Sequence, residues 1–230
     1  IQADLRTFMA LKVHGCSVLT CITAQNSIEV ACVEAVEKNT LLSQIDTLFS
    51  DFSIDALKTG MLLNERIIND TASKLNTYKI TKIVDPVMVT RTGSKLLEDS
   101  AINAYKKFLL PLADLVTPNI YEANLLSGLE IKSKEDIENS ARNIIGLGAK
   151  AVLIKGGGLK NMKGKDFFLD LNGRKEWLFN NLIDTKNTHG SGCTLSAAIC
   201  GYKALGFELL ESIQKAKLFV EKSLENSYKI

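Results

Sequence analysis

Two kinds of hydrophobic pattern alternate along most of the chain. Short, nearly continuous apolar runs predict strands, whereas apolar residues repeated every three or four positions predict amphipathic helices. The predicted strands cover residues 17–23, 56–58, 82–84, 114–116 and 151–155. The predicted helices cover residues 2–13, 41–52, 64–78, 100–110, 120–127 and 134–147. Strands that are apolar on both faces and separated by helices predict an α/β fold whose mostly parallel sheet is covered on both sides.

The pattern changes in the last third of the chain. Two apolar runs flank Asn172-Gly173, a dipeptide typical of tight hairpin turns, so residues 166–179 are predicted to form a β-hairpin. Helical patterns follow over residues 190–205 and 208–224. The chain therefore ends in a predicted hairpin and two helices.

Composition excludes several classes of protein. Hydrophobic residues make up 46% of the 230 residues and the net charge is +2, so no basic stripe indicates nucleic-acid binding. No apolar run approaches the length of a membrane span. No segment has the spacing of a Walker A loop, which excludes a P-loop NTPase. The five cysteines are odd in number and lie mostly in apolar segments, which indicates reduced thiols and a cytoplasmic protein.

Candidate site residues follow the ends of five predicted strands. They are Gln25, Met61, Asp85, Asn119 with Glu122, and Lys155 before three glycines. In an open parallel sheet, ligands bind beyond the carboxyl ends of the strands. One polar residue at a strand end means little, but five strand ends together indicate a site.

The segment 184–198 carries the strongest chemical signal. A polar loop gives way at Gly190-Ser191-Gly192 to a small-residue helical pattern that contains Cys193. Backbone N–H groups at a helix start lack internal acceptors and lie at the positive end of the helix dipole, so they favour an anion. Glycines let a phosphate approach the backbone, and the same field is expected to favour the Cys193 thiolate. These features indicate a phosphate site beside a proton-handling residue.

Each of these residues also has an ordinary structural explanation. The glycine turn can simply precede a core helix, with Cys193 as a small apolar residue. Asp85 can be a polar strand end or a Mg²⁺ ligand beside nucleotide phosphates. Asn119 can be a helix cap, and its spacing from Glu122 also places both on one helical face, where they can share a metal shell. Lys155 can be a surface lysine or a contact to a nucleotide phosphate.

Taken in order, these segments resemble the ribokinase-like superfamily, and within it the hydroxymethylpyrimidine and phosphomethylpyrimidine kinases of thiamine biosynthesis. The matching segments are residues 1–5, 23–26, 58–61, 85–88, 117–119 with Glu122, 155–157 and 184–198. The resemblance implies one three-layer α/β/α kinase domain over residues 1–230. It also implies transfer of a phosphoryl group, dependent on ATP and Mg²⁺, to 4-amino-5-hydroxymethyl-2-methylpyrimidine and then to its monophosphate.

The resemblance also implies roles for individual residues. Cys193 is expected to be the catalytic base or to orient the substrate hydroxyl. Many sugar kinases of the superfamily carry aspartate at this position, so the cysteine favours the pyrimidine kinases and related pyridoxal kinases. Gly190, Ser191 and Gly192 are expected to stabilise the moving phosphoryl group. The remaining expected roles are substrate binding by Gln25, Asp4 and Met61, nucleotide binding by Lys155, Thr188 and Asn119, and metal organisation by Asp85 and Glu122.

Family members ordinarily carry a first strand and a glycine-rich loop before residues 1–5, and a longer tail. The sequence is therefore expected to be truncated at both ends, with the first strand of the sheet missing. Because relatives commonly dimerise, a homodimer is expected. Two other functions stay open: a pyridoxal kinase, whose substrate is also a flat heteroaromatic ring with a hydroxymethyl group, and a non-catalytic module that binds a vitamin precursor.

Overall fold

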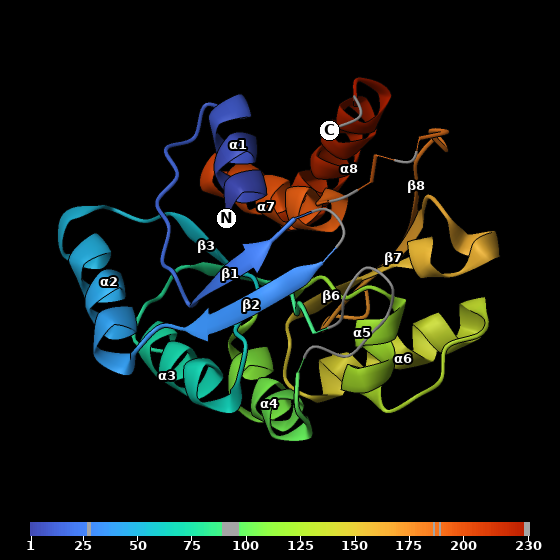
Figure 1. Ribbon diagram of the computed structural model, residues 1–230. Helices are drawn as coiled ribbons and strands as arrows, with labels where there is room; N and C mark the ends of the chain where they lie inside the picture. The colour runs from blue at the N-terminus through green and yellow to red at the C-terminus, as the bar shows by residue number, and fades with distance from the viewer. Residues whose placement is uncertain (27–28, 89–96, 186, 189, 228–230) are drawn as a thin grey trace.

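The computed structural model describes residues 1–26, 29–88, 97–185, 187–188 and 190–227 (Figure 1). A six-stranded sheet with the order β3-β4-β5-β6-β7-β8 lies at its centre. The strands are β3 (Ala56–Thr59), β4 (Thr81–Val84), β5 (Leu115–Val116), β6 (Ala151–Lys155), β7 (Lys165–Asp170) and β8 (Lys175–Phe179). The first four are parallel, whereas β7 and β8 are antiparallel. The predicted mostly parallel sheet and the hairpin predicted over 166–179 are both confirmed.

Helices cover both faces of this sheet, which makes three layers (Figure 1). One layer contains α2 (Lys38–Asp51), α3 (Glu65–Leu75), α4 (Asp99–Ala104), α5 (Ile120–Ser127) and α6 (Lys134–Gly146). The other contains α1 (Gln2–Ala10), α7 (Ser191–Ala204) and α8 (Leu209–Glu225). Short helical turns complete the list: η1 (Tyr105–Leu109), η2 (Leu110–Leu112), η3 (Gly156–Gly158) and η4 (Lys160–Met162). No helix within the described residues is long and apolar enough to cross a membrane.

Successive residues of the central strands point into opposite cores. Ile83 and Leu115 belong to the core under α7 and α8, whereas Val84 and Val116 belong to the larger core under α2 to α6. This alternation explains why the strands read as continuous apolar runs, since both faces are buried. Each fully buried aliphatic side chain contributes about 1.5–3 kcal/mol. The sheet is thus a firm base for the residues that follow its strands.

The strand predicted over 17–23 is shifted in the structure and lies outside the central sheet. Cys21–Gln25 form β1, which pairs antiparallel with β2 (Val30–Ala35) in a separate two-stranded sheet. The expectation that this strand belongs to the mostly parallel sheet was wrong, because the next strand pairs directly with β1. The hairpin also stays exposed: Ile22 is 60% exposed and Val30 is 40% exposed. The hairpin strands therefore do not need apolar side chains on both faces.

Candidate active site

A buried carboxylate lies at the carboxyl edge of the parallel strands. Asp85 directly follows β4 and is 2% exposed. Its Oδ1 accepts hydrogen bonds from Lys155 Nζ at 3.2 Å and Thr117 Oγ1 at 3.3 Å. Its Oδ2 accepts one from Ser196 Oγ at 2.8 Å. Burial opposes ionisation, but the ammonium groups of Lys155 and Lys58 outweigh it and hold the pKa of Asp85 below its ordinary value. Asp85 therefore joins β4, β5, β6 and α7 as a carboxylate.

The Lys155 side chain reaches this carboxylate from the end of β6. Its backbone N–H donates to the Pro118 carbonyl at 2.9 Å, and the residue pairs with Asn119 in a parallel bridge. A Cβ placed on Gly192 would lie 3.4 Å from Lys155 Nζ, so the ammonium lies against the first turn of α7. Burial lowers the pKa of Lys155, but the charges of Asp85 and Glu122 outweigh it and raise the pKa above its ordinary value.

The glycine directly after Lys155 allows its backbone to lie close to the backbone of Lys165. A Cβ on Gly156 would lie 2.1 Å from the Lys165 carbonyl oxygen, so only glycine fits there. The Gly156 N–H donates to Asp166 Oδ1 at 3.1 Å, and Asp166 forms a buried ion pair with Lys217 of α8. The turn that carries Lys155 is therefore fixed from behind by α8.

Lys58 also enters this site, although the sequence gave it no assigned role. Its Nζ lies 3.0 Å from Asp4 Oδ1, and the Lys58 side chain is only 6% exposed. Burial lowers its pKa, but the charges of Asp85 and Asp4 outweigh it and raise the pKa above its ordinary value. Its position at the end of β3, one strand from Asp85, was the available signal.

Two hydroxyl residues were also missed. Ser196 lies three residues after Cys193 on the same face of α7, a spacing that could have revealed it. Thr117 follows β5 and is fully buried. Both donate hydrogen bonds to Asp85, so they keep its carboxylate oriented.

Cys193 lies in the first turn of α7, after Gly190 at φ +79°. This left-handed conformation suits glycine and turns the chain into the helix. The expectation that the helix start favours the thiolate was wrong. Burial and the neighbouring Asp85 raise the pKa of Cys193 above its ordinary value, although Lys58 and Lys155 act in the opposite direction. The Cys193 side chain is therefore a thiol at neutral pH.

Asn119 and Glu122 form a capping box at the start of α5. The Asn119 side chain accepts from the Glu122 N–H at 2.9 Å, and Glu122 Oε2 accepts from the Asn119 N–H at 2.8 Å. Glu122 Oε1 lies 3.4 Å from the Met88 N–H. Burial, opposed in part by Lys155 and reinforced by Asp85, raises the pKa of Glu122 to about 7. The capping explanation is shown, and the same carboxyl also lies in the electrostatic field of the site.

The site offers oxygen donors of the kind that Mg²⁺ prefers. No group of three acidic, histidine or cysteine residues suited to a metal occurs in the described part of the chain. Asp85 and Glu122 nevertheless supply two oxygen-donor groups close enough to interact. Mg²⁺ ordinarily keeps several waters and binds one or two carboxylates together with substrate phosphates. The two carboxyls therefore fit a nucleotide-bound Mg²⁺ but not an all-protein metal cage.

The other predicted site residues lie around this cluster. Asp4 is brought in by its pair with Lys58. Thr188 lies just before α7, where its carbonyl accepts the Ser191 N–H at 3.3 Å. Met61 is half-buried near the end of β3, and its carbonyl accepts from Thr20 Oγ1 at 2.7 Å. Gln25 is exposed at the end of β1 on the separate hairpin, and none of the contacts among described residues joins its side chain to the cluster.

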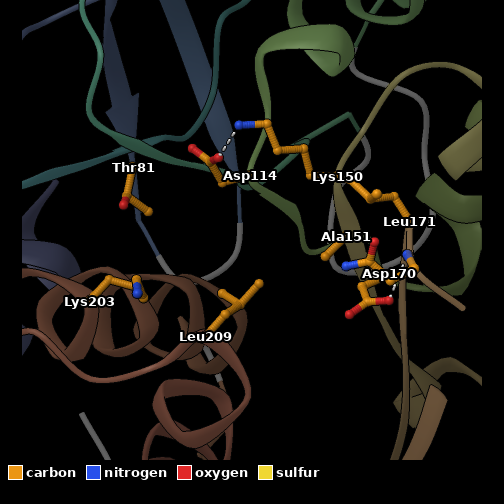
Figure 2. Close-up of a pocket in the computed structure, with 9 residues that line it drawn as sticks. Thr81, Asp114, Lys150, Ala151, Asp170, Leu171, Lys203 and Leu209 are labelled. Carbon is orange, nitrogen blue, oxygen red and sulfur yellow. Dashed lines mark hydrogen bonds and ion pairs between the residues drawn. The ribbon is translucent and has the colours of Figure 1, made fainter. Parts of the chain in front are cut away.

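A surface hollow lies at the opposite, amino edge of the sheet (Figure 2). Its volume is about 260 Å³, and Thr81, Asp114, Lys150 and Asp170 lie on its wall. Lys150 Nζ lies 2.8 Å from Asp114 Oδ1, but the Lys150 side chain is 60% exposed. The ion pair in the hollow is therefore largely exposed, whereas the Asp85 cluster at the other edge is buried.

The sequence matches the phosphomethylpyrimidine kinase family over residues 1–230. The chain belongs to this family. It is 46% identical over 231 residues to the hydroxymethylpyrimidine/phosphomethylpyrimidine kinase of Synechococcus elongatus, covering 100% of this chain and 88% of the relative. The family is one of kinases, so the chain is a phosphotransferase.

Solved structures confirm the fold. The phosphomethylpyrimidine kinase of Clostridium difficile 630 superposes with a TM-score of 0.87 at 36% identity, covering 97% of this chain and 92% of that one. A pyridoxal kinase of Bacillus subtilis in an ADP complex superposes with a TM-score of 0.92 at 36% identity, covering 100% and 88%. The ribokinase-like three-layer fold is therefore shown.

Proposed function

We propose that this chain transfers the γ-phosphoryl group of ATP to the hydroxymethyl oxygen of 4-amino-5-hydroxymethyl-2-methylpyrimidine, and then to a phosphate oxygen of the resulting monophosphate. The family membership supports the substrate class. The observation that carries the chemistry is the buried Lys155–Asp85 pair at 3.2 Å, which lies against the glycine turn that opens α7. The product of the two steps is the pyrimidine diphosphate used for thiamine.

The first turn of α7 stabilises the moving phosphoryl group. The first-turn residues Gly190, Ser191 and Gly192 lie at the positive end of the helix, where backbone N–H groups lack an intrahelical acceptor, although the Ser191 N–H also donates to the Thr188 carbonyl at 3.3 Å. Charge spreads over the phosphoryl oxygens in the transition state, so fixed donors stabilise it more than the ground state. The Lys155 ammonium adds a point charge beside the same turn.

Cys193 orients the substrate hydroxyl in the first step. Because the pKa of its thiol is raised, it is not a preformed base at neutral pH. The hydroxyl oxygen attacks phosphorus, the bond from phosphorus to the ADP oxygen breaks, and the hydroxyl proton passes late in the transfer to an oxygen of the transferred phosphoryl group. A loose transition state needs little help from a base before that point. This assignment chooses hydroxyl orientation over the alternative role of catalytic base.

The remaining roles divide between nucleotide and substrate. Asp85 and Glu122 would hold Mg²⁺ directly or through water, and the ion would neutralise phosphate charge. Thr188 and Asn119 contact the nucleotide near Lys155. Asp4 and Met61 form the substrate wall near the end of β3, and the Gln25 amide donates and accepts at the pyrimidine ring. For Gln25 this role requires the hairpin β1–β2 to border the bound substrate.

The test is turnover of each acceptor separately by the purified protein with ATP and Mg²⁺, followed by ³¹P NMR and by ADP release. Formation of the monophosphate from the alcohol and of the diphosphate from the monophosphate supports the proposal. ADP release equal to the rate without acceptor, for both acceptors, contradicts it.

Pyridoxal is the second candidate substrate, because the Bacillus subtilis pyridoxal kinase superposes with the higher TM-score, 0.92 against 0.87. We expect pyridoxal to be a poorer acceptor than the pyrimidine alcohol. A larger kcat/KM for pyridoxal, together with no turnover of the pyrimidine monophosphate, would reverse that order.

We also propose that residues 1–230 act as one kinase domain, that two copies form a homodimer, and that the protein works in the cytoplasm. The exposed Ile22 and Val30 on the hairpin offer apolar surface to a second copy. All five cysteines are free thiols, as suits a reducing compartment. Sedimentation equilibrium tests the dimer against the monomer mass of 25.2 kDa.

A further inference from the structure

None of the contacts proposed for transfer to the neutral alcohol uses Lys58 directly, although its side chain is buried at the site. The Lys58 side chain is 6% exposed, and its Nζ lies 3.0 Å from Asp4 Oδ1. Lysine is almost never buried to this extent unless it is paired. An ammonium has three donor hydrogens, and Asp4 accepts one of them. Within the part of the chain that the structure describes, no hydrogen bond engages the other two, so they can bind a further anion.

Lys58 and Lys155 lie on opposite sides of Asp85. The sheet order places Lys58 at the end of β3, Asp85 after the neighbouring β4, and Lys155 at the end of β6, two strands further on. Both ammonium groups act on the pKa of Asp85, so both are close to it. The two lysines therefore form two separate positive positions at the carboxyl edge.

The surroundings of the two lysines differ. Lys155 leads into the Gly156–Gly158 turn and lies against Gly192, on the phosphoryl-transfer side. Lys58 instead lies beside the segment that leads to Met61, because a Cβ on Gly60 would be 3.7 Å from its Nζ. It is also joined to α1 through Asp4. Lys58 is thus the ammonium on the side assigned to the phosphoryl acceptor.

The second step needs such a charge and the first does not. The alcohol is neutral, whereas a phosphate monoester carries about −1.5 to −2 charges at pH 7. The carboxylates of Asp4 and Asp85 both act on Lys58, and they would repel a second anion in this part of the site. The fixed ammonium of Lys58 offsets that repulsion and can hold phosphate oxygens by charge-assisted hydrogen bonds.

We propose that Lys58 is the residue that determines specificity for the second phosphorylation, by binding the phosphate of the pyrimidine monophosphate through its two remaining N–H donors. Asp4 holds the ammonium in place for that contact. The inference rests on the proposed function and adds the residue that allows one site to accept both a neutral and an anionic acceptor.

The test compares both steps in Lys58→Met and Lys58→Arg. Lys58→Met keeps the apolar stem and removes the charge. We expect kcat/KM for the monophosphate to fall about 100-fold, mainly through KM, while kcat/KM for the alcohol falls less than about tenfold. Lys58→Arg keeps the charge and should recover part of the monophosphate activity. Equal losses for the two acceptors, or no recovery with arginine, would overturn the assignment.

A matched comparison separates this role from support of the fold. Lys58→Met leaves Asp4 without its partner, so the double variant Asp4→Asn/Lys58→Met is compared with Asp4→Asn alone. The ratio of kcat/KM for the monophosphate to that for the alcohol should fall in the double variant. An unchanged ratio would contradict the proposal even if the single variant does not fold. Lys150→Met, at the amino edge, should leave the ratio unchanged.

Binding of the pyrimidine monophosphate without ATP, measured by calorimetry, separates this inference from the proposed function. If the wild-type protein turns over neither acceptor, the proposed function fails. If it turns over both, and Lys58→Met binds the monophosphate as tightly as the wild type, only the role of Lys58 fails. Weakened binding of the monophosphate with unchanged binding of the alcohol supports it.

Discussion

The two edges of the central sheet both carry a lysine–aspartate pair, but the pairs differ in burial. At the amino edge, Lys150 and Asp114 are 2.8 Å apart and 60% and 26% exposed. At the carboxyl edge, Lys155 and Asp85 are 3.2 Å apart and only 16% and 3% exposed. The longer pair is the buried one. Distance alone therefore does not distinguish a site from a surface contact.

Burial changes what each pair can do. Water screens the Lys150–Asp114 pair, so it contributes about 0–1 kcal/mol, and its loss is tolerated. Loss of either partner of the Lys155–Asp85 pair leaves a charge in a poorly solvated place, which costs about 3–5 kcal/mol. The same desolvation strengthens the field that acts on a bound phosphate. The carboxyl edge thus combines low solvation with fixed charge, whereas the charged pair in the hollow at the amino edge is largely exposed.

The largest difference between the edges should come from Asp85→Asn against Asp114→Asn. Asp85→Asn removes the charge that Lys155 and Lys58 face, so we expect kcat/KM to fall on the order of 1000-fold. We also expect the free energy of unfolding to fall by about 3–5 kcal/mol. Asp114→Asn should change the free energy of unfolding by about 1 kcal/mol or less. Urea denaturation and steady-state kinetics check both.

Two results would contradict the contrast. Equal destabilisation by the two variants would mean that burial does not decide the strength of these pairs. Full activity in Asp85→Asn would show that the charge of Asp85 has no role in the reaction.

A pH titration tests the desolvation of the carboxyl edge. The pKa of Glu122 is about 7 in the folded protein, against an ordinary value of 4.5. Below pH 4.5 both states hold the proton. Between about pH 4.5 and 7 the unfolded chain has already lost the proton that the folded chain still holds, so stability falls with rising pH by up to about 3 kcal/mol, and the loss is complete above pH 7. The free energy of unfolding of metal-free protein, measured from pH 4 to 8, checks this.

Glu122→Gln is the control for this titration. Glutamine keeps an acceptor for the Asn119 N–H but has no proton to lose in this range. The free energy of unfolding of the wild type minus that of Glu122→Gln should therefore fall as the pH rises from about 4.5 to 7. A difference that stays constant across this range would show that the carboxyl of Glu122 is not desolvated.

Replacement of Lys155 tests the part of the carboxyl edge that is proposed to bind the nucleotide. Lys155→Met keeps the stem and removes the ammonium beside the first turn of α7, so we expect kcat/KM for ATP to fall about 100-fold. Lys150→Met is the matched variant at the amino edge and should change kcat/KM by less than about twofold. Similar losses in the two variants would indicate a general effect of charge on the protein rather than a contact in the site.

The sequence predicted which residues come together at the site better than it predicted their individual contacts. Parallel strands end at one edge, so Asp85 and Lys155 could be placed together from strand order alone. Lys58 also lies at the end of a parallel strand. A lysine at such a position is usually solvated, however, and the sequence does not indicate its pairing with Asp4. The direction of the Cys193 pKa was mispredicted because the helix field is visible in the sequence and burial is not.

The hairpin shows the corresponding limit for the fold. The apolar run near β1 predicted a strand, but a run of apolar residues does not state its pairing partner. β2 pairs with β1 locally and leaves Ile22 60% exposed. Strands in the central sheet could be predicted because two helix layers require apolar residues on both faces. The hairpin carries no such requirement, and its place relative to the substrate depends on side chains such as Gln25.

The smallest effect we predict separates the two steps of one site. Cys193→Ala removes the thiol that orients the hydroxyl, so we expect kcat for the alcohol to fall about 30- to 100-fold. The monophosphate presents an anionic oxygen that needs no proton removed, so its kcat should fall less than about tenfold. Quench-flow measurement of each transfer with saturating ATP isolates the chemical steps. Cys200→Ala, in the buried part of the same helix, controls for packing.

The comparison with Lys58→Met makes this result decisive. If the two residues divide the steps as argued, Cys193→Ala impairs the alcohol more and Lys58→Met impairs the monophosphate more. Each variant then serves as the control for the other, because a general loss of folding or of ATP binding would lower both steps together. Parallel losses in both variants would mean that one set of contacts serves both acceptors. Opposite selectivity instead requires the Lys58 charge and the Cys193 thiol to act on different acceptors within one carboxyl edge.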